Sequence, residues 1–383
     1  MRNLRGVVVT VSLLFHCLAR GGFAEELLVL KGERAEVVCA AAGGAIVSFR
    51  LSGESLNPLN WEVPADLATR ETKPGAPRGH FLCLDRWGAP SPAELKNGVP
   101  FHGEAPYARW NLGTAVKRSE KCISAEMGCE LPLAGLRISR VLELDTAGTT
   151  FKVVESVTST ARLGRVYNMV QHPTIAPPFL DEQTLVDTNA FEGFSQDDPP
   201  PLYKRNELQQ KTGSLWPRMR LLKKDVDLRR LETGTEKEAI SDVTSFVFHD
   251  HAELGWVVAS NPGKKLLLGY VWSTRDYPWL NLWRFRQGEQ RLARGLEFGT
   301  TGYHQPFPVL VKTGRILDRA TYDYLDAGET KSRSYLCFLA PIPGDFAGVA
   351  QLSIHAGRLE LCERRDLQPR VIQVPTSLSI SSQ

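Results

Sequence analysis

The chain has 383 residues, of which 46 are Lys or Arg and 43 are Asp or Glu, so its formal net charge is only +3. Short basic runs such as Lys223-Lys224 are interleaved with acidic residues, and the sequence contains no long basic block. Nucleic-acid binding would require a basic stripe, so we expect no nucleic-acid partner. The length and a hydrophobic content of 42% are sufficient for a large buried core.

The first 24 residues have the order of a secretory signal peptide. A basic start at 1–5 precedes a nearly apolar stretch at 6–19, and small residues then lead to Ala24. The apolar stretch is shorter than the ~20 residues that a membrane-spanning helix needs. We therefore predict cleavage near Ala24 and a secreted or periplasmic protein without a membrane anchor. Residues 25–383 are expected to form a single domain.

Six cysteines follow the predicted signal peptide, an even number that permits disulfides in an exported protein. Their pairing stays open, although Cys122 and Cys129 are separated by the shortest loop. Zinc binding is the alternative, but the sequence has no CxxC pair. We expect disulfides or plain buried thiols, and no metal. The six are Cys39, Cys83, Cys122, Cys129, Cys337 and Cys362.

Most of the mature chain has the pattern of short strands separated by turns. Residues 136–145 alternate apolar and polar side chains, and 149–158 do the same after a turn at Ala147-Gly148. Helical periodicity is scarce, and the best helix candidate is a short one with Ser91 as its cap and Pro92 at its first position. The pattern predicts an all-β protein built as one large antiparallel sandwich rather than βαβ units.

Two segments place a histidine where its ring can be presented to a cavity. In 98–110, His102 precedes a glycine, and Arg109 follows as a donor for sugar hydroxyls. In 170–181, His172 is expected to end a strand and precedes Pro173, so the chain is held extended there and the ring keeps a fixed orientation. A core histidine satisfied by the backbone, or an incidental one in a proline-rich loop, is the alternative in each case.

A third segment, 269–283, contains five aromatic residues with polar residues among them. Sugar recognition uses aromatic faces against C–H surfaces and polar groups for hydroxyls, so Trp279 and Asn281 are candidate contacts. An ordinary sandwich core is the alternative.

The fourth segment places Glu297 between Leu296 and Phe298 on a predicted strand. If the two hydrophobic neighbours pack into the core, Glu297 is a surface residue. If the inner face is instead a groove, Glu297 lies in it with a raised pKa, which suits a general base.

The order of these segments resembles the galactose mutarotase-like superfamily, which includes the aldose 1-epimerases. The stretches 43–51 and 57–61 look like the family's early strand and the segment after it, and the resemblance extends from about Val29 to Phe338. It implies a large antiparallel super-β-sandwich. It also implies interconversion of sugar anomers by acid/base ring opening, without a cofactor or metal.

The resemblance assigns roles to individual residues. His172 is similar to the family's general acid and Glu297 to its general base, while His102 and Asp242 resemble residues that hold the sugar. The sequence departs from the usual pattern at Glu104, where a second glycine is common, and 102–110 looks closer to the hexose-phosphate mutarotases. The resemblance also makes Arg86 the arginine ahead of the first histidine. With the contacts expected from the segments themselves, the candidate sugar-binding residues are His102, Asp242, Arg86, Arg109, Trp279 and Asn281.

The expected partner is a free sugar or an oligosaccharide, bound by a monomer or a homodimer. Two other functions remain open on the same fold. One is a non-catalytic carbohydrate-binding or glycan-processing accessory protein. The other is a polysaccharide lyase, for which Tyr167, Tyr303 and His304 are the candidate cluster.

Overall fold

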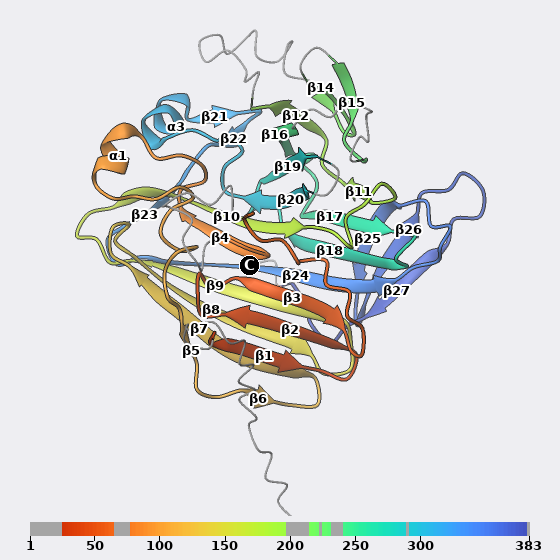
Figure 1. Ribbon diagram of the computed structural model, residues 1–383. Coiled ribbons are helices and arrows are strands. Elements are labelled where there is room, and N and C mark those ends of the chain that lie inside the picture. Colours follow the sequence, from red (N-terminus) through yellow and green to blue (C-terminus); the bar gives the residue numbers. More distant parts are fainter. Residues whose placement is uncertain are drawn as a thin grey trace, which may run out of the picture.

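The computed structural model describes residues 25–64, 77–196, 214–221, 224–230, 240–288 and 291–380. Within these ranges the chain forms two large antiparallel sheets that pack face to face (Figure 1). The predicted signal peptide, 1–24, lies outside the described residues. No helix in the described part of the chain is long and apolar enough to cross a membrane.

The first sheet has eleven described strands, all joined by antiparallel pairing. In order across the sheet they are β1 (Leu27–Lys31), β2 (Ala35–Ala40), β3 (Ile46–Leu51), β4 (His80–Asp85), β10 (Arg165–Ile175), β20 (Arg291–Gly299), β19 (Trp279–Gln287), β16 (Ile240–Val247), β12 (Glu192–Ser195) and β13 (Ser214–Leu215), with β23 (Asp323–Leu325) paired to β10.

The second sheet has nine described strands and is also antiparallel. Its order is β11 (Leu185–Thr188), β17 (Leu254–Asn261), β18 (Leu266–Ser273), β24 (Thr330–Pro341), β9 (Thr150–Ser159), β8 (Leu136–Asp145), β7 (Cys122–Leu131) and β5 (Asn111–Leu112), with β6 (Lys117–Arg118) paired to β7.

Smaller elements surround the sandwich. Helices α1 (Pro92–Lys96) and α3 (Phe307–Thr313) lie near each other at one end of the eleven-stranded sheet (Figure 1). The remaining strands form two hairpins and one three-stranded sheet: β14 (Arg218–Leu221) with β15 (Lys224–Asp227), β21 (Arg315–Ile316) with β22 (Arg319–Ala320), and β25 (Val349–His355), β26 (Arg358–Glu363) and β27 (Val371–Pro375).

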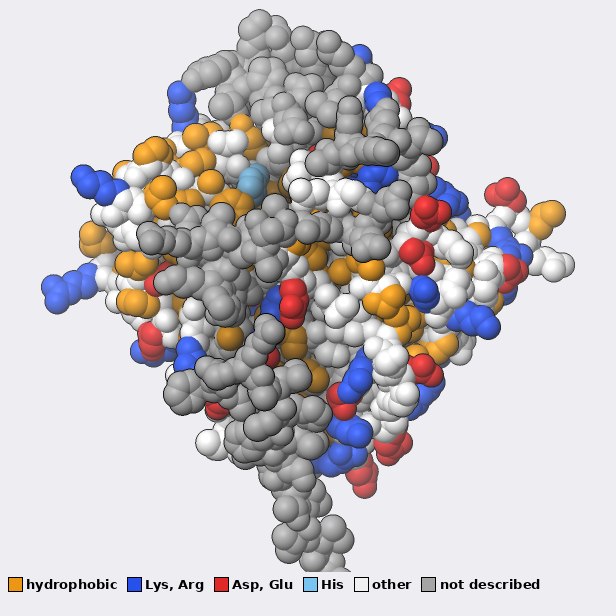
Figure 2. All heavy atoms as spheres, viewed as in Figure 1, with side chains coloured by type: hydrophobic (Ala, Val, Ile, Leu, Met, Phe, Trp, Pro, Cys, Tyr) orange, Lys and Arg blue, Asp and Glu red, His pale blue; other side chains and the backbone are white. Residues whose placement is uncertain are grey.

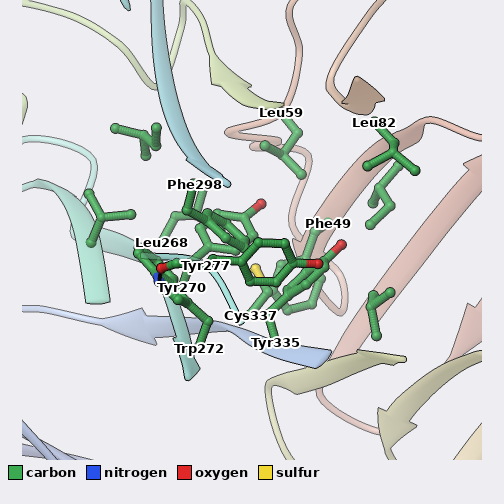
Figure 3. Packing of buried hydrophobic residues seen from close by; sticks show 14 of the residues in the cluster. Phe49, Leu59, Leu82, Leu268, Tyr270, Trp272, Tyr277, Phe298, Tyr335 and Cys337 are labelled. Carbon is green, nitrogen blue, oxygen red and sulfur yellow. Dashed lines mark hydrogen bonds between the residues drawn. The ribbon is translucent and has the colours of Figure 1, made fainter. Parts of the chain in front are cut away.

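The main core fills the space between the two large sheets. Phe298 from β20 stacks on Trp272 from β18 with ring centroids 4.1 Å apart, and Tyr270, Tyr277 and Tyr335 surround the pair (Figure 3). Because side chains alternate along a strand, the neighbours of these core residues point to the other face of their sheet. We call that face of the eleven-stranded sheet, turned away from the core, the outer face.

The C-terminal sheet β25–β27 has its own hydrophobic contacts. Leu359 and Leu361 of β26 belong to a cluster with Trp256, Leu267 and Phe338 of the nine-stranded sheet. These three residues lie on the side of that sheet away from the main core, so the C-terminal sheet covers apolar surface that water would otherwise reach.

The predicted all-β sandwich is confirmed. The predicted strand 136–145 is β8, and the predicted short helix is α1, where Ser91 and Glu94 form a reciprocal capping box.

The expected closeness of Cys122 and Cys129 is wrong. They stand near opposite ends of the single extended strand β7, where seven residues span about 23 Å. A disulfide needs Cα atoms within about 7 Å. All six cysteines of the described part are free thiols, and Cys39, Cys83, Cys129 and Cys337 are buried.

Candidate functional site

Five side chains form a row across the outer face of the eleven-stranded sheet. The register pairs Phe81 with His172, Asn281 with Glu297, and Ser245 with Asn281. The pairing of Gln171 with Phe298 places His172 beside Glu297 on the adjacent strand. The row therefore runs, from β4 to β16, through Phe81, His172, Glu297, Asn281 and Ser245.

Glu297 is buried although its neighbours Leu296 and Phe298 point into the main core. Both alternatives expected from the sequence are therefore true in part: the neighbours are core residues, and the carboxyl is only 1% exposed. The Trp87 indole Nε1 donates a hydrogen bond to Oε2 of Glu297 at 2.6 Å. Burial raises the pKa of Glu297 well above its usual value, and the Trp87 hydrogen bond opposes this shift.

His172 contacts the other oxygen of this carboxyl. Its Nε2 lies 3.1 Å from Oε1 of Glu297, and its Nδ1 lies 3.0 Å from the Thr174 hydroxyl. The Phe81 ring stacks on the imidazole with centroids 4.2 Å apart. Burial lowers the pKa of His172 to about 3, because the charged imidazolium loses its hydration. Both ring nitrogens thus have a fixed partner, and the ring is held in one orientation.

His172 was expected at the end of a strand, and it lies instead inside β10, which continues through Pro173 to Ile175. Pro173 has no N–H, but the strand tolerates it here while keeping its register with β4 at His80. The interior of a strand between two paired neighbours is a more rigid position than a loop.

His102 lies in a turn above the row and has a φ of 65°, a left-handed conformation that few non-glycine residues adopt. Its Nδ1 accepts a hydrogen bond from the Gly88 N–H at 3.0 Å. In the neutral ring the proton is then on Nε2, which can donate to a ligand. Burial lowers the pKa of His102 well below its ordinary value, so the ring is neutral at neutral pH.

His304, on the loop after β20, is a third histidine beside the row. Its ring centroid is 6.0 Å from that of His102 and 4.6 Å from that of Trp87. Burial lowers the pKa of His304 to about 4. Sequence reasoning had considered His304 only for a lyase, and it had not singled out Trp87 at all.

Aromatic rings surround the histidines on the outer face. Trp283 of β19 lies 6.1 Å from His172, and Trp61 lies 5.7 Å from Trp283 and 6.2 Å from Phe81. Figure 2 shows hydrophobic side chains gathered over the end of the molecule that carries α1 and α3, with a histidine side chain exposed among them. Rings and neutral imidazoles together suit a ligand with both an apolar face and hydroxyl groups.

Asn281 is the predicted sugar-binding residue that lies in the row itself. Its Nδ2 donates to the Thr301 carbonyl at 3.1 Å, while its buried Oδ1 has no partner in the described structure. A buried acceptor without a donor is costly, so a ligand hydroxyl beside Glu297 would satisfy it.

Two predicted sugar ligands are engaged elsewhere. Asp242 accepts two hydrogen bonds from Arg284, at 3.0 and 2.8 Å, and both residues lie on the core side of the sheet, in register with each other. Arg86 binds both oxygens of Glu94, at 3.0 and 2.7 Å, and is almost fully buried. In the structure both side chains are therefore held by protein partners, and their part in sugar binding stays a prediction.

The other two predicted contacts are also displaced from the row. Trp279 is fully buried, donates from Nε1 to the Ala320 carbonyl at 2.8 Å and packs with Phe194, so its faces are not available as a stacking platform. Arg109 is an exposed residue that pairs with Glu26.

The candidate lyase cluster does not assemble. Tyr167 points to the core side of β10, where its hydroxyl accepts a hydrogen bond from Arg333 at 2.6 Å. Tyr303 belongs to the hydrophobic cluster around Trp279. Among the residues that the structure describes, no group of three or more His, Cys, Asp or Glu side chains is arranged to hold a metal ion.

Solved structures with the same architecture place this arrangement in context. A candidate aldose 1-epimerase from Klebsiella pneumoniae matches with a TM-score of 0.58 at 15% identity, over 84% of this chain and 81% of that one. A galactose mutarotase related enzyme from Lactobacillus acidophilus matches with a TM-score of 0.54 at 13% identity, over 83% of this chain and 98% of that one. A galactose mutarotase-like protein from Clostridium acetobutylicum gives 0.53 and 13%, with coverages of 83% and 98%.

No protein-family model and no curated protein sequence matches the chain. The likeness therefore lies in the three-dimensional structure. The chain has the galactose mutarotase-like fold, as the resemblance predicted, and carries a buried Glu–His pair on the outer face of its larger sheet.

Proposed function

We propose that the protein binds a free sugar on the outer face of the eleven-stranded sheet and interconverts its anomers, as an aldose 1-epimerase does. The observation that carries this proposal is the contact of 3.1 Å between His172 Nε2 and Glu297 Oε1. Both groups are buried, and burial shifts their pKa values in opposite directions. Paired groups of this kind are typical of acid/base catalysis.

In this mechanism the two groups hold one proton between them. Burial favours the uncharged form of each, so the resting pair is a carboxylic acid beside a neutral imidazole. Transfer of that proton within the contact gives a carboxylate beside an imidazolium. The charged pair is the form that starts ring opening. The neutral pair is the form that remains once the ring is open.

Ring opening then follows as two coupled proton transfers. The Glu297 carboxylate takes the proton of the anomeric hydroxyl, and the His172 imidazolium gives its proton to the ring oxygen. The bond between C1 and the ring oxygen breaks while the C1 carbonyl forms. After rotation about C1–C2, Glu297 returns its proton to the aldehyde oxygen, His172 removes the hydroxyl proton, and the ring closes on the other face. Such assistance is worth about 10²–10⁴-fold in rate.

The remaining residues of the site would hold the sugar in place. His102 Nε2–H and the unpartnered Oδ1 of Asn281 offer one donor and one acceptor to ring hydroxyls. Trp283 and Trp61 offer aromatic faces to the C–H surface of the ring. Fixed contacts of this kind keep the reacting oxygens aligned with the Glu–His pair.

We also propose that the protein works outside the cytoplasm. The support is the order of basic, apolar and small residues in 1–24. N-terminal sequencing of the chain recovered from the periplasm or medium, after expression from Met1, is expected to begin close to Glu25. Recovery of the intact N-terminus in the cytoplasm alone would contradict this part of the proposal.

Polarimetry tests the catalytic proposal. Fresh solutions of α-glucose and α-galactose should approach their equilibrium rotation faster with the protein than with buffer. Glu297→Gln should abolish this acceleration, and Glu120→Gln, the same change at an exposed position between β6 and β7, should retain it. Equal rates for wild type and buffer with both sugars would contradict the proposal, and sugar binding without turnover would favour a non-catalytic carbohydrate-binding protein.

A further inference from the structure

The segment Arg86, Trp87 and Gly88, here called the Trp87 segment, brings an indole over the outer face beside Glu297. It follows Asp85, which ends β4 with a φ of 81°, an unfavourable conformation for a residue with a side chain. Asp85 is held there by an ion pair with Arg165. The backbone therefore turns away from the sheet at this point, and the Trp87 ring lies over the row, where it is only 2% exposed.

The Trp87 segment is fixed on both sides of the indole. On one side, Arg86 forms two hydrogen bonds to Glu94 of α1. On the other, Gly88 exchanges two hydrogen bonds with His102, one from its N–H to Nδ1 and one from the His102 N–H to its carbonyl, each 3.0 Å long. The indole between these anchors has little freedom to move.

Gly88 also sets the distance to His304. It has a φ of 94°, and a Cβ added there would lie 2.5 Å from Nε2 of His304. The third histidine thus packs directly on the backbone of the Trp87 segment, and its ring contacts the Trp87 ring edge-on. One short segment consequently connects Glu297, His102 and His304.

We propose that Trp87 is a positioning residue for the reaction: its Nε1–H holds Oε2 of Glu297, stabilises the carboxylate form, and leaves Oε1 directed at His172 and the sugar. This inference rests on the proposed function. Its basis is the 2.6 Å hydrogen bond from a buried, anchored indole to the oxygen that His172 does not contact. A hydrogen bond to a charged acceptor is stronger than one to a neutral acceptor, so the bond favours the form that starts ring opening.

The expected effect of losing the N–H follows from this difference. The carboxylate–imidazolium form becomes rarer relative to the neutral pair, so kcat should fall roughly tenfold, which corresponds to one pKa unit. The KM for the sugar should change little, because Trp87 reaches the carboxyl and not the sugar. Activity requires the pair to hold its one proton, so it is lost as the pH rises through the pKa of Glu297. Without the Trp87 hydrogen bond that pKa is higher. The alkaline limb of the pH profile of kcat, where activity is lost as the pH rises, should therefore move up by about one pH unit.

The test is Trp87→Phe, which removes the N–H and retains an aromatic ring. Trp272→Phe is the matched control, because it deletes a buried indole N–H that donates to the Tyr277 carbonyl inside the main core, on the opposite face of the eleven-stranded sheet from Glu297. Both variants should be compared by kcat, KM and the pH dependence of kcat. Only Trp87→Phe should shift the alkaline limb.

A second measurement guards against a variant that folds poorly. Benzothienylalanine at position 87 retains the shape of the indole and replaces its N–H with sulfur, so it should give the same shift with an undisturbed fold. Infrared titration of the Glu297 carboxyl, assigned by difference against Glu297→Gln, should show the higher pKa directly and needs no turnover.

The outcomes separate the two proposals. An unchanged limb and an unchanged carboxyl titration in both Trp87 variants would overturn the role of Trp87 even if the enzyme is active. A loss of kcat at every pH without any shift would also overturn it, because a purely structural role predicts that result. In the remaining outcome the wild type shows no turnover while the titration of the Glu297 carboxyl still depends on Trp87. That result would contradict the proposed reaction and support the hydrogen bond from Trp87 to Glu297.

Discussion

At the scale of single residues, the candidate site depends on how each polar group is held. Glu297 has a different partner on each carboxyl oxygen, Trp87 on Oε2 and His172 on Oε1. His172 has Thr174 on its second nitrogen. The buried pair is thus oriented by direct hydrogen bonds at both ends, which is the arrangement that precise proton transfer requires.

Thr174 tests this orientation. Thr174→Val removes the hydroxyl 3.0 Å from His172 Nδ1 while keeping the shape of the side chain. We expect turnover to fall roughly fivefold, because a hydrogen bond of this kind is worth about 1 kcal/mol. Thr174→Ser retains a hydroxyl and should keep most of the activity in the same polarimetric assay. Equal activity of the Val and Ser variants would show that this bond does not orient the ring.

Asp242 has one role by the family resemblance, sugar binding, and another by the structure, an ion pair with Arg284. If it bound the sugar, Asp242→Asn would raise KM. Because it pairs with Arg284 on the core side of the sheet, we expect KM to stay unchanged and the free energy of unfolding to fall by on the order of 3 kcal/mol. Urea denaturation and the KM measured on the same preparation decide between the two roles.

At the scale of elements, the strands position the site and the connections cover it. The row from Phe81 to Ser245 is set by strand register alone, whereas His102, Trp87 and His304 come from turns that fold back over the outer face. The C-terminal sheet β25–β27 lies elsewhere, on the nine-stranded sheet, and its contacts with Trp256 and Phe338 give it a role in stability.

Leu361 of β26 tests that structural role. It is fully buried in the cluster between the C-terminal sheet and the nine-stranded sheet. Leu361→Ala should therefore lower the free energy of unfolding by about 2–5 kcal/mol. The rate of anomer interconversion per folded molecule should not change, since none of the site residues contacts this cluster among the residues described. A large loss of turnover at full folding would show that the C-terminal sheet acts on the site.

At the scale of the whole molecule, buried histidines connect stability to pH. Burial lowers the pKa values of His80, His102, His172 and His304 below those of an unfolded chain, which are near 6.5. The unfolded state therefore binds more protons as the pH falls below about 7. Glu297 and Asp85 act in the opposite direction, because burial raises their pKa values, that of Asp85 to about 6.

The four histidines outweigh the two acids, so stability should fall between pH 7 and pH 5, by on the order of 3 kcal/mol. Denaturant midpoints across this range measure it. His102→Gln should flatten the dependence, because it removes one of the buried imidazoles. A midpoint that is constant or rises toward pH 5 would contradict this prediction.

The sequence predicted much of the fold because the strands alternate clearly. The alternation in 136–145 gives β8 at its observed bounds, and the motif at Ser91 gives the capped helix α1. Glu297, His172 and Asn281 were found because their neighbours on the chain are strand residues. A side chain on a strand can point only to one or the other face of the sheet, so a polar residue among hydrophobic neighbours is easily noticed.

The remaining features of the site depend on information that a linear pattern lacks. A shift of one residue along β16 would place Asp242 on the outer face with the site. Only its pairing with Arg284 shows that it lies on the core side of the sheet. Trp87 reaches Glu297 across 210 positions of sequence, from a turn set by the unusual backbone of Asp85 and Gly88. The Trp-Gly pair directly after a buried strand was the signal that could have indicated such a turn.

We propose that the Glu297–His172 pair opens and closes a sugar ring. Exchange spectroscopy by NMR on glucose labelled with ¹³C at C1 measures this directly, because the two anomers give separate signals at equilibrium. We predict that the wild-type protein accelerates exchange between the α and β signals, and that Glu297→Gln and His172→Gln each reduce the acceleration by about 10²-fold or more. Acceleration that survives in both folded variants would contradict the account.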